Sequence, residues 1–291
     1  MPENKTIIIT GASGFIGSFL CKYFAENGWN VIGLVRKLPK EEIRNVRYEL
    51  FEMPNNIPLE VFKNSDAIVY CSYSKFSPSN PNSDKINKEG TEKLLEISRA
   101  SSNPKFIFLS SMSAHKDALS HYGRSKFALE KIFDPNKDVI LKPGLVMGNG
   151  GMLKTISEYI SKHKTIPLPG NGIQPVQTLT LLNLSDAIQK IIMDKLSGTF
   201  CLGEVIPITI KEFYTEVAKQ SNKNIKFISI PFWPLFMFVR FIETIGLKTS
   251  TSSESLLGLK QLKSFDTAHD LQKLGIEILD YKTNIETNFT N

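Results

Sequence analysis

The sequence predicts an α/β protein whose larger part is a doubly wound parallel sheet, followed by a smaller mixed lobe toward the C-terminus. Short apolar runs alternate with helical patterns through the first half of the chain. These runs are apolar along their length rather than at every second position, as expected of strands covered on both faces. A glycine-rich turn follows the first run, and the regular alternation ends near Pro143.

The expected strands follow one another with helices between them. The strands are predicted at 5–10, 30–35, 46–50, 67–71, 105–110 and 138–142, with helices ending near Asn27 and covering about 85–100 and 122–133. Strands that alternate with helices of 10–15 residues are typical of a parallel sheet with a helical layer on each face.

Beyond Pro143 the pattern becomes irregular. Prolines and glycines at 167–172 precede a strand–helix pair at 177–196, and Thr209 and Glu212 have the spacing of a capping box. That box predicts a helix running to about Ser221.

These segments divide the chain into two expected domains. The first covers 1–145 and the second covers 146–291, with about 177–203 returning to the first.

Composition restricts the functional classes. The 41% hydrophobic and 22% charged residues are typical of a soluble globular protein. The net charge of +6 comes from scattered Lys and Arg residues. Scattered charge favours a phosphate-rich small ligand over nucleic acid.

The three cysteines and four histidines lack metal-ligand spacing, so reduced, mostly buried thiols and no metal site are expected. Residues 1–5 do not resemble a signal peptide, and no apolar run reaches membrane-spanning length. We therefore expect a cytoplasmic protein without a transmembrane segment.

A glycine-rich turn joins the first predicted strand to the first predicted helix. Its sequence is Gly11-Ala-Ser13-Gly14-Phe15-Ile16-Gly17. Gly11 permits a tight turn, Gly14 lets the backbone approach a diphosphate, and Gly17 lets the helix pack closely on the strand. Free N–H groups at the positive end of the helix favour the phosphates. The turn predicts a dinucleotide-binding domain of Rossmann type.

The end of the second predicted strand indicates which dinucleotide binds. Arg36 lies nineteen positions after Gly17 and is followed by Lys37. Proteins selective for NAD(H) usually carry an acid there, which bonds the ribose 2′-hydroxyl and would repel a 2′-phosphate. Arginine would instead pair with that phosphate. We predict NADP(H) as the preferred cofactor, with NAD(H) as the alternative.

A tyrosine and a lysine four positions apart, Tyr122 and Lys126, begin the helical pattern at 122–133. This spacing places both on one face of a helix. Free tyrosine has a pKa of about 10, so it needs a nearby cation to act as an acid or base at neutral pH. Ser110 and Ser111 place hydroxyls at the carboxyl edge of the predicted sheet, where ligands bind in such folds.

Several segments together resemble the extended short-chain dehydrogenase/reductase family, in particular its nucleotide-sugar epimerase, dehydratase and reductase branch. Besides the glycine turn they are INKEGTEKLLE at 86–96, FIFLSS at 106–111, YGRSK at 122–126, KPGLVMGNG at 142–150 and TLLNLSDAI at 180–188. The resemblance implies an enzyme with an NAD(P)-binding first domain and a second lobe that binds a nucleotide sugar. It also implies a homodimer formed through the helices near 85–100 and 122–133.

The resemblance implies catalytic roles for three residues. Ser111 would bind the substrate carbonyl, with Ser110 and Ser113 as competing hydroxyls. Tyr122 would be the general acid/base, and Lys126 would lower its pKa and bind the cofactor ribose.

Further cofactor contacts are implied by the same family pattern. Cys71 and Ser72 would lie beside the cofactor, and Pro143 and Gly144 would shape its nicotinamide end. Asn87 matches a helix asparagine that is more structural than catalytic.

The chain departs from the family pattern at several positions. The acid usual after the third strand is missing, with Glu52 as the nearest candidate, and His115-Lys116 stand where Tyr-Gly is usual. The segment around Asn183 lacks the usual paired acids, and the interval between Ser111 and Tyr122 is short. None of these changes removes a predicted catalytic group.

The short interval, Arg36 and the apolar tail resemble bacterial reductases that act on 4-keto-6-deoxy nucleotide sugars in polysaccharide biosynthesis. The resemblance implies net reduction of a keto group, with Tyr122 as the general acid. The alternatives are a nucleotide-sugar epimerase or dehydratase, a dehydrogenase of another small alcohol or ketone, and an NADP(H)-binding assembly or sensor protein.

Residues 232–247 form the most aromatic stretch of the chain. We expect a core-facing helix of the small lobe or a subunit contact. The alternative is a helix that lies in a membrane interface, against which Arg240 and Glu243 argue.

Overall fold

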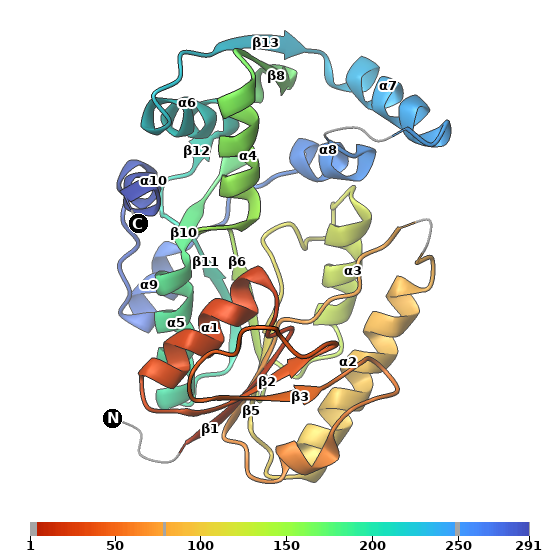
Figure 1. Cartoon of the computed structure of the whole chain (residues 1–291), viewed down its shortest axis with the longest axis vertical. Helices are drawn as coiled ribbons and strands as arrows, with labels where there is room; N and C mark the ends of the chain where they lie inside the picture. The colour runs from red at the N-terminus through yellow and green to blue at the C-terminus, as the bar shows by residue number, and fades with distance from the viewer. Residues whose placement is uncertain (1–4, 78–79, 248–250, 291) are drawn as a thin grey trace. The chain divides into compact units, whose positions relative to one another are not determined.

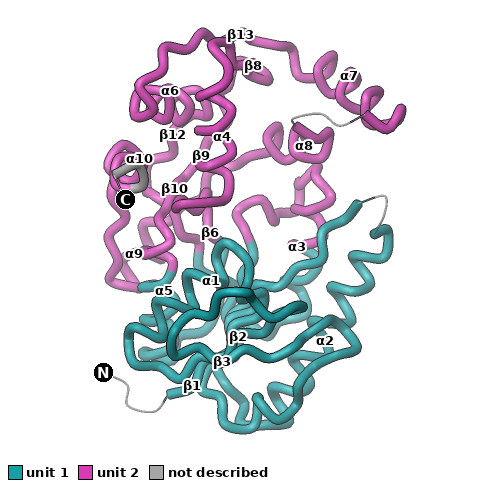
Figure 2. Tube along the Cα trace, viewed as in Figure 1, with its two compact units in different colours: residues 1–110, 127–142, 185–200 teal, residues 111–126, 143–184, 201–291 magenta. Residues whose placement is uncertain are grey.

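The computed structural model describes residues 5–77, 80–247 and 251–290 (Figure 1). Figure 2 shows two compact units, each made of three segments: unit 1 comprises 1–110, 127–142 and 185–200, and unit 2 comprises 111–126, 143–184 and 201–291. The N-terminal residues 1–4, which the signal-peptide prediction used, lie outside the described residues. The domain boundaries predicted from sequence stay a prediction, because a structural division does not show what each part binds.

Unit 1 is built on a seven-stranded sheet with the order β11-β6-β5-β4-β1-β2-β3. The strands are β1 (Thr6–Thr10), β2 (Asn30–Val35), β3 (Val46–Leu50), β4 (Ala67–Tyr70), β5 (Lys105–Leu109), β6 (Val139–Pro143) and β11 (Gly198–Leu202). The pairings from β3 through β6 are all parallel. The chain runs outward from β1 to β3 and returns to the other side of β1 with β4. This is the doubly wound α/β arrangement that the sequence predicted.

The helices associated with this sheet are α1 (Phe15–Glu26), α2 (Ser83–Ala100), α3 (His121–Glu130) and α5 (Leu181–Met193), with a 3₁₀ turn at Leu59–Phe62. Leu94 and Leu95 of α2 and Leu129 of α3 share one buried cluster with the strand residues Phe106 and Phe108. Neighbouring strand positions point to the opposite face of the sheet. The sheet is therefore buried on both faces, which explains why its strands are apolar throughout.

Helices α1 and α5 lie side by side. The hydroxyl oxygen of Tyr23 is 2.7 Å from Asp186 Oδ1 and 2.8 Å from Gln189 Oε1. Desolvation on burial, together with the hydrogen bond to Asp186, raises the pKa of Tyr23. These hydrogen bonds join α1, near the start of the chain, to α5, which comes from the second half of the sequence.

Unit 2 has its own core and three small two-stranded sheets. Its strands are β7 (Leu145–Met147), β8 (Thr165–Pro169), β9 (Pro175–Val176), β10 (Thr178–Thr180), β12 (Ile208–Thr209) and β13 (Lys226–Ile230). Its helices are α4 (Gly151–Lys162), α6 (Ile210–Gln220), α7 (Phe232–Thr244), α8 (Ser253–Lys260), α9 (Ala268–Leu274) and α10 (Tyr281–Thr290). A 3₁₀ turn covers Gly170–Gly172. Leu153, Ile156 and Ile160 of α4 pack with Phe213 and Val217 of α6.

The predicted capping box is confirmed at the start of α6. Glu212 N–H donates to Thr209 Oγ1 over 3.1 Å, and Thr209 N–H donates to Glu212 Oε2 over 2.7 Å. The predicted strand–helix pair at 177–196 is present as β10 and α5.

Helix α7 corrects one expectation. The segment is helical, but it does not face the core: Val239 is the buried residue of this helix, and its other large apolar side chains are half-buried or exposed. The prediction of a core-facing helix is therefore wrong, whereas the other interpretation, a subunit contact, stays a prediction. A run of apolar residues predicts a helix and its length, but not whether the rest of the chain covers it.

Two further findings concern residue classes. Cys21, Cys71 and Cys201 form no disulfide, but the expectation that they are mostly buried is wrong, because Cys71 and Cys201 are half-buried. Cys21 is buried, and desolvation raises its pKa to about 12. Among the described helices, none combines the length and apolar character needed to cross a bilayer.

Candidate functional site

The glycine turn of unit 1 leaves no room for larger side chains at two positions. Gly11 has a φ of +67°, and its carbonyl accepts the Gly14 N–H over 2.9 Å. A Cβ on Gly17 would lie 2.3 Å from Gly11 O, far inside contact distance. Glycine at 17 therefore lets α1 start directly against the turn, as the sequence predicted.

The start of α1 fits a phosphate group. Gly14 is the N-cap of the helix and provides no side-chain cap, and Ser13 and Gly14 are exposed. The N–H groups of Phe15, Ile16 and Gly17 open the helix and have no carbonyl partner within it. These donors, the helix dipole and the missing side chain at 14 suit the diphosphate of a dinucleotide.

A threonine that the sequence analysis did not single out joins the ends of β1 and β4. Thr10 is fully buried, and its Oγ1 accepts the N–H groups of Cys71 over 3.1 Å and Ser72 over 3.0 Å. A Cβ on Gly11 would come within 3.2 Å of Ser72 N. The strand order reverses between β1 and β4, and ligands of doubly wound sheets bind at such points. The only sequence signal was a hydroxyl residue closing an apolar strand.

Asn87 has the structural role expected for it. It is buried in α2, accepts the Ser74 N–H at Oδ1 over 2.8 Å and donates from Nδ2 to Ser74 O over 2.8 Å. This pair fixes the backbone that follows Cys71 and Ser72.

The predicted specificity residues are accessible. Arg36 and Lys37 follow β2 at the carboxyl edge of the sheet, and both are exposed. Glu52, the candidate for the missing acid after β3, is exposed and exchanges backbone hydrogen bonds of 2.8 Å with Asn56. Cofactor contacts of Arg36, Lys37 and Glu52 stay predictions.

A buried network distinguishes two of the competing serines. The hydroxyl of Ser110 donates to Glu130 Oε1, and Lys142 Nζ lies 2.9 Å from the same carboxylate. Ser110 and Lys142 are both buried. Because its hydroxyl is committed to Glu130, Ser110 is less suited than Ser111 to bind a substrate.

The three predicted catalytic residues all lie in one segment of unit 2, 111–126. Ser111 is half-buried, and its Oγ accepts the Ser113 N–H over 3.1 Å. A Cβ on Gly123 would lie 2.4 Å from Ser113 O, so the first turn of α3 packs closely against the loop that follows Ser111.

The tyrosine and the lysine differ in exposure. Tyr122 is 39% exposed, whereas Lys126, four residues later on α3, is 3% exposed. Their spacing places them on one face of the helix. The His121 N–H donates to Glu254 Oε2 over 2.6 Å at the start of this helix. The arrangement provides an accessible phenol with a buried cation one turn away.

Pro143 is the last residue of β6 and Gly144 follows it; both belong to unit 2. A Cβ on Gly144 would lie 2.1 Å from Gln177 O, and the Gly144 N–H donates to Leu202 O over 2.8 Å. Packing therefore explains the glycine, and the role of both residues at the nicotinamide stays a prediction.

The predicted residues fall into two groups. Unit 1 brings the glycine turn and Cys71-Ser72 together at the switch point, with Arg36 at the same edge of the sheet; unit 2 holds Ser111, Tyr122, Lys126 and Gly144. Within the described residues, no group of His, Cys, Asp and Glu could hold a metal ion.

Comparison with protein families gives a match over more than half of the chain. Residues 7–175 match the NAD dependent epimerase/dehydratase family. This range includes the glycine turn, Arg36, Ser111, Tyr122 and Lys126.

One curated relative is the "Ceramide reductase" of Caulobacter vibrioides, which is 25% identical over 193 residues. The match covers 64% of this chain and 59% of that protein, so the chain spans little more than half of the relative's length.

Solved structures share the fold over nearly the whole chain. The UDP-N-acetylglucosamine 4-epimerase from Bacillus cereus has a TM-score of 0.71 at 17% identity and covers 98% of this chain and 96% of its own. MoeE5, solved with UDP-glucose and NAD, has a TM-score of 0.73 at 16% identity, with 98% of this chain and 97% of that chain covered. At these identities the likeness supports the Rossmann-type fold.

Proposed function

Since the chain belongs to the NAD-dependent epimerase/dehydratase family, which makes it an NAD(P)-dependent enzyme of the short-chain dehydrogenase/reductase type, we propose that it reduces a keto group on a nucleotide-activated sugar. The proposed substrate is of the 4-keto-6-deoxy type, and the proposed cofactor is NADPH. The observation that carries this proposal is the exposed Arg36-Lys37 pair at the carboxyl end of β2.

The cofactor preference bears on the reaction type. An arginine at this position suits a 2′-phosphate, which distinguishes NADP(H) from NAD(H). In net reduction the cofactor must exchange at each turnover, whereas an epimerase usually keeps its NAD bound and recycles it. A site selective for NADP(H) therefore favours the reductase over the epimerase or dehydratase alternative.

The residues of segment 111–126 account for the proton chemistry. The hydroxyl of Ser111 donates a hydrogen bond to the substrate carbonyl oxygen and polarises it. As negative charge develops on that oxygen, the phenol of Tyr122 gives it a proton and the ketone becomes an alcohol. Lys126 stabilises the resulting phenolate by its charge, so the tyrosine can act near neutral pH. Solvent then restores the phenol.

The residues of unit 1 account for cofactor binding. The N–H groups of Phe15, Ile16 and Gly17 would bind the diphosphate, and Arg36 would bind the 2′-phosphate. NADPH, when bound, supplies the hydride that reduces the carbonyl carbon. A homodimer and a cytoplasmic location belong to the same proposal and can be checked by sedimentation and fractionation.

A second candidate substrate follows from the curated relative. The Caulobacter protein is named for a lipid, and 25% of the residues in the 193-residue match are identical. A keto group on a long-chain lipid could use the same Ser111 and Tyr122 chemistry, because the proton and hydride steps do not depend on the rest of the substrate. Both substrate classes therefore belong in one assay.

The test is the oxidation of NADPH and NADH, followed by absorbance, with 4-keto-6-deoxy nucleotide sugars and with 3-keto sphingoid lipids in mixed micelles. We expect NADPH oxidation with a nucleotide sugar, lowered by roughly 10²–10⁴-fold in Tyr122→Phe. The Ser110→Ala variant is the matched control for Ser111→Ala, because only Ser111 should bind the substrate.

The cofactor preference has its own variant. Arg36→Asp should weaken NADPH binding by roughly tenfold to hundredfold and leave NADH binding unchanged or improved, as expected for one lost charge-assisted contact. Unchanged NADPH affinity in this variant would remove the argument for the reductase. Interconversion of two nucleotide sugars without net oxidation of either cofactor would favour the epimerase.

A further inference from the structure

Helix α7 of unit 2 is apolar over most of its circumference, with Arg240, Glu243 and Thr244 as its polar residues, and it is largely uncovered. Trp233 is 55% exposed, Met237 64%, Phe238 62% and Phe241 61%, and Ile245 and Leu247 just beyond the helix are also exposed. A helix with so much apolar surface is normally covered by a protein core or by a membrane. Here the protein itself covers only one side.

The exposed residues form one continuous surface. At 100° per residue, positions 233, 234, 237, 238 and 241 fall within a single arc of about 140°. Helix α8 contacts α7 and lies beside it in Figure 1. Glu243 of α7 accepts the N–H and the hydroxyl of Ser253. We call the exposed arc the α7 face.

The exposed apolar residues of the α7 face indicate that another molecule covers it. Four large side chains of this face keep more than half of their surface in contact with water, which is unfavourable for apolar groups. Contiguous apolar patches of this kind mark protein or membrane interaction sites.

Charge indicates which occupant fits. Residues 219–263 contain seven Lys and Arg but only two acids, Glu243 and Glu254. Both acids are engaged within unit 2, Glu243 with Ser253 and Glu254 with the His121 N–H. Lys219 pairs with Glu216 and Lys263 pairs with Asp117, so these two lysines do not add to a surplus. The cations that complement an anionic surface are therefore those at the α7 face itself.

Two cations lie at the α7 face itself. From the sequence Arg240 argued against an interfacial helix, but it is exposed at the edge of the apolar arc rather than within it, where it can reach the headgroups. Lys260 of α8 places its Nζ 3.7 Å from the centroid of the Trp233 ring and 4.8 Å from that of Phe232. Aromatic rings beside lysine or arginine are characteristic of helices that lie at the boundary between lipid headgroups and acyl chains.

A second copy of the chain fits less well. A two-fold interface brings the same patch of both copies together, so it would bring the cations of one α7 face against those of the other, which disfavours association. The helix is also too short to span, because its 13 residues extend about 20 Å against a hydrocarbon core of about 30 Å.

We propose that the α7 face docks this protein on an anionic lipid bilayer, with the helix lying in the interface and Arg240 and Lys260 at the level of the headgroups. This inference concerns the surface of unit 2 and does not depend on which keto substrate is reduced. It would bring the enzyme to lipids or lipid-linked compounds in that bilayer.

Sedimentation with vesicles tests the proposal on the full chain. We expect binding to phosphatidylcholine vesicles that contain about one third phosphatidylglycerol, and weaker binding to phosphatidylcholine alone. Phe238→Glu with Phe241→Glu should lower binding at least about tenfold, because two anchoring rings are replaced by anions. The matched control is Leu59→Glu with Leu279→Glu, two residues that are also at least half exposed but lie outside the α7 face.

The charge argument has a separate variant. Arg240→Gln with Lys260→Gln should lower binding to the anionic vesicles by roughly thirtyfold and leave binding to phosphatidylcholine nearly unchanged. All variants should keep the NADPH affinity of the wild type, which also shows that they fold.

Tryptophan fluorescence provides a second readout. Trp29 is buried and Trp233 is exposed, so a blue shift on adding vesicles reports on the α7 face. Absence of binding to either vesicle type would overturn the proposal. A concentration-dependent dimer that the Phe238→Glu, Phe241→Glu variant abolishes, without vesicle binding, would assign the face to a second copy instead.

Discussion

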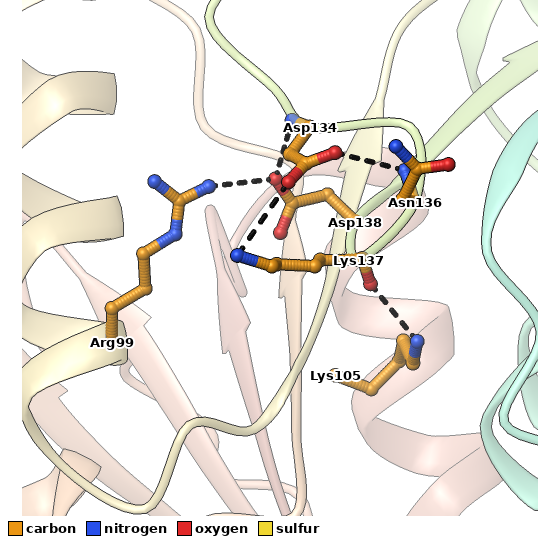
Figure 3. Close-up of polar contacts among 6 residues, drawn as sticks. All are labelled: Arg99, Lys105, Asp134, Asn136, Lys137 and Asp138. Carbon is orange, nitrogen blue, oxygen red and sulfur yellow. Dashed lines mark hydrogen bonds and ion pairs between the residues drawn. The ribbon is translucent and has the colours of Figure 1, made fainter.

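The two edges of the sheet in unit 1 satisfy their polar groups in different ways. At the carboxyl edge, a hydroxyl of Thr10 accepts two backbone N–H groups, and the glycine turn leaves the first N–H groups of α1 without a side-chain cap. At the amino edge, a carboxylate accepts a backbone N–H group instead. Asp138 Oδ2 accepts the Asp134 N–H over 2.8 Å and lies 3.0 Å from Arg99 at the end of α2 (Figure 3).

The amino edge is closed by further bonds in the same cluster. Lys105 Nζ, at the start of β5, donates to Lys137 O over 2.9 Å, as Figure 3 shows, and the Gly198 N–H donates to Asp138 O over 3.0 Å. Desolvation lowers the pKa of Lys105, although the charge of Asp138 opposes that shift. The cluster thus joins the starts of β5, β6 and β11.

This difference indicates that one edge of the sheet binds a ligand and the other edge stabilises the fold. Donors left open at the carboxyl edge can bind an anionic ligand, whereas the amino edge uses its charged groups on the protein itself. Substitutions at the amino edge should therefore change the free energy of unfolding without changing cofactor affinity. The carboxyl edge should show the reverse, except where a glycine is required by packing.

A substitution at Gly17 should change both the stability and the cofactor affinity, because this glycine is required by packing. Gly17→Ala places a Cβ 2.3 Å from Gly11 O, so the turn must shift. We expect the free energy of unfolding to fall by roughly 2–3 kcal/mol and NADPH affinity to fall with it. Denaturant melts and NADPH titration by fluorescence measure the two effects.

Gly14→Ala is the matched control in the same turn. Its Cβ would meet Gly11 O at 3.1 Å, a tight but tolerable contact, and Gly14 has a φ of −83° that alanine can adopt. NADPH affinity should fall by about tenfold or more, because the methyl group approaches the diphosphate, while stability changes little. A Gly14→Ala variant that unfolds as easily as Gly17→Ala would contradict the division of roles within the turn.

Asp138 tests the amino edge. Asp138→Ala leaves Arg99 and the Asp134 N–H without their acceptor. The free energy of unfolding should fall by about 2 kcal/mol, the usual cost of losing a largely buried, charge-assisted bond. NADPH affinity of the folded variant should remain that of the wild type, and a clear loss would show that the two edges are coupled.

A neighbouring lysine supplies the control. Lys137 Nζ lies 3.7 Å from Asp134 Oδ2, and both side chains are accessible to solvent. Removing such an exposed pair in Lys137→Ala should change stability by less than about 1 kcal/mol. An effect as large as that of Asp138→Ala would mean that the cluster acts through exposed charge rather than through buried hydrogen bonds.

Much of unit 1 could be predicted from sequence because its signals are local. The ends of β2 and β3 were predicted to the residue, since apolar runs flanked by polar residues mark buried strands. The strand predicted at 138–142 begins one residue later, because Asp138 belongs to the turn that starts at Asp134 and donates its N–H to Asp134 O.

Other features depend on partners that are distant in sequence. Nothing local marks Thr10 as the acceptor for Cys71 and Ser72, or Glu130 as the partner of Ser110. The exposure of α7 was missed for the same reason, since its composition is that of a buried helix.

Asp134 provides the smallest expected effect and a check on pH. Its carboxylate accepts the Asn136 N–H over 3.0 Å, and this bond and the charge of Lys137 lower its pKa. A carboxyl whose pKa is lower in the folded state stabilises the fold above its unfolded pKa of about 3.9 and loses that contribution as pH falls through the folded value. The difference in Tm between wild type and Asp134→Asn should therefore be constant near neutral pH and shrink below about pH 4.

Raised salt should remove only the part of this Tm difference that is due to Lys137, because screening affects the exposed charge more than the hydrogen bond. A difference that persists unchanged at low pH would show that the amino edge is held by shape alone, without a contribution from this charge.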